Sequence, residues 1–120
     1  MVLPVEVTVA APFRAFRAAP KMPPLSNRAA CYTKLGALPE ALKDAEECIA
    51  LAPTFIKGYT RKATAQFFMK EYEKALESYQ QGLEHEPDNA ECKEGVQRCY
   101  QQIARVRRVD VVVLLHDSQL

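Results

Sequence analysis

The stretch PEALKDAEECIALAP at residues 39–53 has a counterpart in YEKALESYQQGLEHEP at residues 72–87. When the chain is shifted by 34 residues, alanines, a leucine and a proline fall on identical residues, both inside these stretches and before them. The coinciding pairs are Ala29 and Ala63, Ala41 and Ala75, Leu42 and Leu76, and Pro53 and Pro87. Coincidence at one fixed offset indicates an internal repeat, and periods of about 20 to 50 residues are typical of helical arrays.

Each repeat is predicted to form two helices joined by a short turn. In residues 39–52, apolar residues recur at the spacings that place them on one helical face. Gly36 is a suitable residue to end the helix before it, and Pro39 suits a first helical turn. Pro53 then prevents continuation of the second helix. We expect helices over about residues 26–35, 39–52, 54–69, 72–85 and 90–106.

The sequence therefore predicts an all-α fold, with no sheet between residues 25 and 106. Two repeats, about residues 22–55 and 56–89, are followed by a capping helix at about 89–106 that covers the second hairpin. Alanines at equivalent places let paired helices approach closely. Four residues are expected to pack rather than to bind ligand: Tyr32, Tyr59, Phe67 and Tyr79.

The two ends of the chain differ in composition from the repeats. Residues 1–24 contain five prolines and are expected to be disordered or irregular, with an organellar transit segment as a weaker interpretation. Residues 107–120 are expected to form an apolar tail. Within that tail, residues 109–115 favour β-structure, so they would pack across the capping helix or promote aggregation.

Composition limits the classes of partner. The chain has 120 residues, room for one domain, with 16 Lys and Arg against 15 Asp and Glu, a net charge of +1. A nucleic-acid partner is not expected without a large basic surface. The longest apolar run, Val111 to Leu115, is far shorter than the roughly 20 residues that cross a bilayer, so no membrane partner is expected. We expect a cytoplasmic location, with the nucleus as an alternative.

The sequence shows no pattern typical of catalysis or metal binding. The four cysteines, Cys31, Cys48, Cys92 and Cys99, lack the spacing of zinc or thioredoxin motifs. They are expected to be buried or half-buried thiols in a reducing compartment, with a redox role or a metal site as alternatives. No nucleophile–base pair or Gly-rich phosphate loop is present, so we expect no enzyme, no catalytic residue and no cofactor.

Two motifs carry a resemblance to a known family. They are SNRAACYTKL at residues 26–35 and FIKGYTRKA at residues 55–63. With the 34-residue unit, they resemble the tetratricopeptide repeat of the carboxylate-clamp type. Residues 27–99 look most like the last such domain of the heat-shock protein 70/90 organising co-chaperones, in their plant form. The resemblance implies an adaptor that binds the acidic C-terminal tail of heat-shock protein 90 or 70.

Three residues match clamp positions of that family: Asn27, Lys57 and Arg61. Asn27 and Arg61 are one repeat apart, and Lys57 precedes Arg61 by one helical turn. The tail offers two carboxylates close together. Arg61 would present a planar fork to one of them, Lys57 a point charge, and Asn27 an amide donor. The neighbouring Lys62 points elsewhere and is expected to be solvated.

The chain also departs from the family. A further Lys and Asn come from an upstream repeat, and residues 1–24 lack the matching pattern, so three of five clamp positions are present. Both ends look like material joined to a fragment of a longer protein. We therefore expect weakened tail binding, and self-association through the uncovered first hairpin is left open. The alternative function is a degenerate tetratricopeptide scaffold, or a truncated product, that does not bind chaperone tails.

Overall fold

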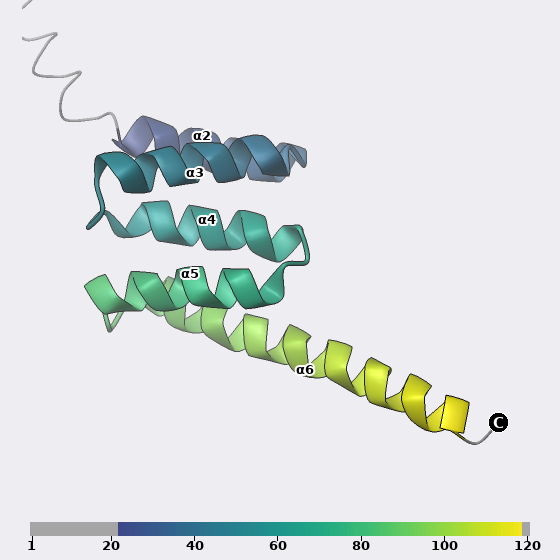
Figure 1. Cartoon of the computed structure of the whole chain (residues 1–120). Helices are drawn as coiled ribbons and strands as arrows, with labels where there is room; N and C mark the ends of the chain where they lie inside the picture. Colours follow the sequence, from purple (N-terminus) through teal and green to yellow (C-terminus); the bar gives the residue numbers. More distant parts are fainter. Residues whose placement is uncertain (1–21, 119–120) are drawn as a thin grey trace, which may run out of the picture.

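The computed structural model describes residues 22–118, and this part of the chain is helical with no strand. Five helices follow one another, each antiparallel to the next within a stack (Figure 1). They are α2 (Met22–Leu35), α3 (Leu38–Leu51), α4 (Ile56–Phe68), α5 (Tyr72–His85) and α6 (Ala90–Ser118). The predicted all-α fold of two hairpins and a capping helix is confirmed.

The helices form two layers. Helix α4 contacts α2 and α6 as well as its sequence neighbours α3 and α5, whereas α3 and α5 do not contact each other within the described residues. Helices α2, α4 and α6 therefore lie in one layer, and α3 and α5 lie in the other. Figure 1 shows α2 behind α3 and the start of α6 behind α5. The first helix of each pair thus faces the same side of the molecule.

Two helix ends differ from the sequence expectation. Helix α2 begins at Met22 rather than near Ser26, because prolines in a first helical turn cost no hydrogen bond. Helix α6 continues to Ser118, although it was expected to end near residue 106 and to give way to an irregular tail. No Gly or Pro follows Gly95 within α6, so nothing in the sequence stops the helix. The predicted irregular tail at residues 1–24 lies, up to residue 21, outside the described residues.

The core is centred on the second hairpin. Ala63 of α4 and Ala75 and Tyr79 of α5 are buried with two cysteines of α6, Cys92 and Cys99. Partly buried apolar side chains pack against this cluster: Ile56, Phe67, Leu76, Leu83 and Val96. Asn89 caps α6, because its side-chain oxygen accepts a hydrogen bond from the Cys92 amide at 2.9 Å. The cap fixes where α6 begins beneath α5.

The first hairpin buries smaller side chains and one ion pair. Ala29 of α2 and Ala41, Ala45 and Cys48 of α3 are fully buried. Arg28 of α2 reaches α3 with a fork, in which Nε and a terminal nitrogen donate to the two Asp44 oxygens at 2.7 and 2.8 Å. This hydrogen bonding and the charge of Asp44 raise the pKa of Arg28. The pair joins the two helices where the apolar contact is small.

The hairpin turns occupy equivalent places in the repeat. Gly36 ends α2 and Lys70 follows α4, and both have positive φ, 82° and 66°. In each turn two backbone amides donate to carbonyls of the last helical turn, so the two turns have the same hydrogen-bond pattern. Gly adopts this backbone conformation freely, whereas Lys is strained in it.

The cysteines only partly match their predicted burial. Cys48, Cys92 and Cys99 are buried, whereas Cys31 is exposed on α2 because no helix of the described part covers that face. Burial raises the pKa of Cys48, and it raises those of Cys92 and Cys99 to about 11. Within residues 22–118 no cluster of metal-binding side chains is present.

Candidate functional site: a cationic surface on the first helices

The three predicted clamp residues lie on two helices that contact each other. Asn27 is exposed on α2, Lys57 is exposed in the first turn of α4, and Arg61 is half-buried one turn later on α4. Because α2 contacts α4, all three residues belong to the layer formed by α2, α4 and α6 (Figure 1). Lys57 and Arg61 are four residues apart and therefore share one helical face.

Arg61 and Lys57 differ from many neighbouring cations in having no ion pair among the described residues. Lys62, the next residue after Arg61, contacts Glu46 at 3.7 Å across the hairpin boundary. Arg28, directly after Asn27, pairs with Asp44. The protein thus neutralises the cations beside the predicted clamp positions with its own carboxylates and leaves Lys57 and Arg61 available for another anion.

Arg61 lines a cleft of about 310 Å³ between α4 and α6. The α4 side is formed by Arg61, Thr64, Phe67 and Phe68, Tyr79 of α5 contributes to the lining, and the α6 side is formed by Glu91, Glu94, Gly95 and Arg98. Arg98 donates to Glu94 at 2.7 Å, so these two charges satisfy each other. Asn27 and Lys57 do not line this cleft.

Local packing holds the cleft in shape. The Thr64 and Tyr79 hydroxyls are 3.1 Å apart and share a hydrogen bond, and Thr64 also donates to the Thr60 carbonyl at 2.7 Å. Gly95 lies directly against the Tyr79 ring, and any β-carbon at that position would clash with it. Burial raises the pKa of Tyr79, so its hydroxyl stays protonated and neutral. The aromatic ring therefore occupies one position between the two helices.

The Arg61 guanidinium holds the least satisfied polar atom of this region. Its Nε is shielded from solvent and has no hydrogen-bond partner among the described residues. A buried donor without an acceptor is costly, particularly on a charged group. A ligand that brings a carboxylate or carbonyl oxygen to Arg61 would relieve that cost, and it would add charge-assisted hydrogen bonds from the rest of the fork.

The α6 side of the cleft was not predicted from the sequence, in which α6 was expected only to cap the second hairpin. A further shift of 34 residues nevertheless carries Lys57 to Glu91, Arg61 to Gly95 and Thr64 to Arg98. These equivalences were the available signal, since residues at equivalent places on α4 and α6 face the same side of the stack. Tyr79 was expected to be a packing residue; it is buried and also borders the cleft.

Comparisons with known proteins agree with the helical-repeat fold. The tetratricopeptide repeat model matches residues 56–89, which are the second hairpin and its closing turn. The structure described as the TPR2B-domain:pHsp70-complex of yeast Sti1 superimposes with a TM-score of 0.61 and 34% identity, over 74% of this chain and 73% of that one. The chain belongs to the tetratricopeptide repeat (TPR) family.

Two more similar proteins are a plant organizing protein and a second solved TPR domain. Hsp70-Hsp90 organizing protein 2 of Arabidopsis thaliana is 66% identical over 86 residues, which are 72% of this chain and 15% of that protein. The chain thus spans about 15% of the length of such curated relatives. The first TPR of Spaghetti (RPAP3), solved with the HSP90 peptide SRMEEVD, has a TM-score of 0.63 at 31% identity and covers 67% of this chain and 64% of that one.

Proposed function

We propose that this TPR domain is a protein-interaction module that binds the acidic C-terminal tail of heat-shock protein 70 or 90. Asn27, Lys57 and Arg61 act as an incomplete carboxylate clamp in this proposal. The observation that carries it is the unsatisfied, shielded Nε of Arg61 beside the unpaired Lys57. The shielded Nε of Arg61 has no acceptor within the described part of the chain, and the exposed Lys57 adds a positive charge that no described carboxylate pairs with.

The solved complexes of related TPR domains support this class of ligand. One contains an HSP90 peptide that ends in EEVD, and another is a complex of yeast Sti1 with an Hsp70 peptide. A peptide ending in Asp carries its side-chain carboxylate next to the terminal carboxylate. Such a pair suits an arginine fork and a lysine one helical turn away.

Two positions of the full clamp have no match in the sequence, so we expect weak binding. Each charge-assisted hydrogen bond contributes about 1.5–3 kcal/mol. The loss of two donor residues therefore corresponds to roughly two to four powers of ten in affinity, at about 1.4 kcal/mol per power. The affinity that remains is expected to depend on Arg61 and Lys57 and to fall with rising salt.

Calorimetric titration of the full chain with the peptide SRMEEVD tests the proposal. We expect measurable weak binding that disappears when the peptide C-terminus is amidated. Arg61→Ala should lower the affinity by about one to two powers of ten, the equivalent of one charge-assisted interaction. Lys62→Ala is the matched control, since Lys62 is the next cation in the sequence and pairs with Glu46; its affinity should stay close to that of the unaltered chain.

Equal binding of the amidated peptide, or unchanged affinity in Arg61→Ala, would show that no carboxylate clamp operates. The chain would then be a TPR scaffold that has lost the tail ligand. Circular dichroism of each variant checks that the helices are intact, so a loss of binding is assigned to the side chain.

A further inference from the structure

The second half of α6 extends beyond the stack of helices. Cys92, Val96 and Cys99 pack against the core, whereas every residue from Ala104 to His116 is exposed. Figure 1 shows this segment projecting past the other helices. We call residues 105–118 the α6 extension. It lies apart from the predicted clamp residues on α2 and α4.

The α6 extension has an apolar tip formed by residues 111–114. Val111, Val112, Val113 and Leu114 are each between 52% and 67% exposed. Successive residues of a helix are rotated by about 100°, so four consecutive apolar residues cover its whole circumference. Soluble proteins rarely leave an apolar surface of this kind uncovered. The tip is therefore expected to be covered by something that encloses it on all sides.

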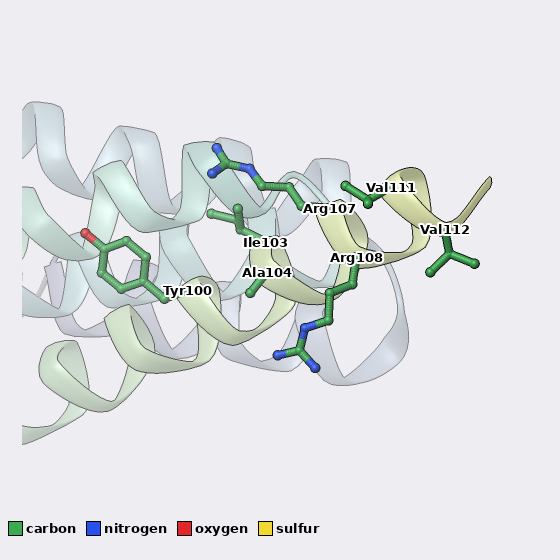
Figure 2. A pocket seen from close by; sticks show the side chains of 7 residues that line it. All are labelled: Tyr100, Ile103, Ala104, Arg107, Arg108, Val111 and Val112. Carbon is green, nitrogen blue, oxygen red and sulfur yellow. The ribbon is translucent and has the colours of Figure 1, made fainter. Parts of the chain in front are cut away.

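An arginine-bordered groove lies at the base of the tip. The groove is a shallow hollow of about 660 Å³ along one face of α6 alone; it contains no carboxylate and is lined by Tyr100, Ile103, Ala104, Arg107, Arg108, Val111 and Val112 (Figure 2). Figure 2 shows the Arg107 and Arg108 side chains leaving the helix in different directions. Arg105 adds a third cation two residues before Arg107. Positive charge thus surrounds the helix directly before its apolar tip.

Asp110 is the one carboxylate between these arginines and the tip. It lines a different groove, which faces the start of α5 and is also lined by Lys70, Lys74 and Arg107. Glu71, the residue before α5, and Glu73 of α5 line this second groove as well. Asp110 therefore faces a mixed-charge surface of the domain, and the arginine-bordered groove keeps its positive character.

We propose that the α6 extension binds the surface of an anionic phospholipid bilayer. A phospholipid presents a phosphate beside apolar chains, and the groove presents guanidinium groups beside apolar side chains. One partner helix would cover a single stripe of the tip, whereas a bilayer interface encloses all of it. The tip, residues 111–114, rises about 6 Å along the helix at 1.5 Å per residue, which lies within the roughly 5–10 Å depth that interfacial helices reach.

This binding differs from crossing a membrane. No helix among the described residues is both long and apolar enough to span a bilayer. Sequence analysis expected no membrane partner because it considered only the length of the apolar run. Binding at an interface requires less apolar length, since the arginines remain at the level of the phosphates.

A single introduced tryptophan tests the proposal directly, because the chain contains none. Leu114→Trp in the full chain should shift its fluorescence to shorter wavelength with vesicles of phosphatidylserine and phosphatidylcholine, and much less with phosphatidylcholine alone. The matched control is Leu35→Trp, since Leu35 is 80% exposed at the end of α2. It should show no shift with either vesicle. Absence of a shift at Leu114, or an equal shift at Leu35, overturns the proposal.

Vesicle flotation separates the contribution of the arginines. Arg108→Glu should weaken binding to phosphatidylserine vesicles by about tenfold or more. Lys43→Glu changes the net charge equally at an exposed position of α3 and should change binding little. Equal effects of the two variants would show that the groove is not used.

A second copy of the chain is the competing occupant of the tip. Sedimentation velocity without vesicles measures self-association, and Leu114→Asp is the variant compared with the unaltered chain. A dimer that Leu114→Asp abolishes, combined with no vesicle binding by the unaltered chain, overturns the proposal in favour of self-association. A monomer that binds vesicles and loses that binding in Leu114→Asp supports it.

Discussion

In the first hairpin the fully buried apolar side chains are alanines and Cys48, whereas the second hairpin buries Tyr79 beneath α6. The 34-residue shift places Ala45 of the first on Tyr79 of the second. Residues that follow one repeat pattern thus build cores of different size. The second hairpin lies between α3 and α6, and the first has a neighbouring hairpin on one side only within the described residues. A repeat therefore acquires its large core from its neighbours.

The two hairpins also differ in the polar contact that joins their helices. In the first hairpin, the exposed Arg28 of α2 and the buried Asp44 of α3 form an ion pair that joins its two helices. The equivalent positions of the second hairpin are Lys62 and Ser78, and Ser78 donates instead to Gln66 at 2.6 Å inside the core. A charged pair thus joins the helices where apolar burial is small, and a neutral hydrogen bond suffices where it is large.

The largest expected effect comes from removing the side chain that distinguishes the two cores. Tyr79→Ala gives the second hairpin the residue of the first and should lower the free energy of unfolding by about 3–5 kcal/mol. Urea unfolding followed by circular dichroism measures the loss. Tyr79→Phe removes only the hydroxyl bonded to Thr64 and should cost about 1 kcal/mol.

Leu35→Ala also removes a large side chain, but from the first hairpin and at a different position of the repeat from Tyr79. Leu35 is a large residue that is 80% exposed among the described residues, so this variant should leave stability nearly unchanged. A loss as large as that of Tyr79→Ala would mean that an unseen contact covers the first hairpin, and the contrast between the two cores would not hold.

The repeat pattern was sufficient to predict the two hairpins, but it could not predict where the terminal helices begin and end. Ala29, Ala41, Ala63 and Ala75 are all fully buried, as their repeated small size indicated. Helix α6 continued beyond its expected end because the apolar periodicity that defines packing stops earlier than the helical backbone does. An exposed helix needs no apolar face to persist when no Gly or Pro interrupts it.

The candidate site was predictable only in part for a similar reason. Motif matching gave Asn27, Lys57 and Arg61 by residue type. It could not show that Arg61 has a shielded Nε or that Lys62 pairs with Glu46, because both depend on side chains from other helices. The α6 side of the cleft requires knowing that α4 and α6 are neighbours in space.

A smaller effect is expected from the two equivalent turns. Lys70→Gly gives the second hairpin the turn residue of the first and should stabilise the domain by about 1 kcal/mol, because the positive φ is then unstrained. Gly36→Lys should destabilise it by a similar amount. Differential scanning calorimetry should show melting temperatures that move in opposite directions. Two shifts of the same sign would show that backbone strain does not determine the turn preference.

The smallest effect concerns the thiols on the two sides of the stack. Cys31 lies on the face of the first hairpin that no described helix covers, whereas Cys92 and Cys99 lie in the core of the second hairpin. Iodoacetamide at neutral pH should therefore label Cys31 quickly and the other two slowly. Peptide mass mapping over time measures the difference. Labelling of Cys92 as fast as that of Cys31 would show that α6 opens readily from α5.

The burial of Cys92 and Cys99 also makes the stability of the fold depend on pH. Burial raises the pKa of Cys92 and Cys99 from 9.0 to about 11, so these thiols deprotonate more easily in the unfolded chain. Their contribution to stability is fully present below pH 9 and is lost as the pH rises toward 11. The double variant Cys92→Ala/Cys99→Ala should lack this part of the alkaline decline in urea unfolding, and an unchanged decline would assign it to other groups.

The order of contacts along the stack has a consequence for how the chain folds. Among the described residues, each helix contacts only the next helix or the one after it. Forming these contacts requires closing only short loops, and chains of this kind fold in microseconds to milliseconds. Helix α4 alone contacts the four other described helices, so its amide protons are expected to exchange slowest, with protection decreasing toward α2 and toward the end of α6. During synthesis, once α2 to α5 have left the ribosome, α4 can already form its contacts with every described helix except α6.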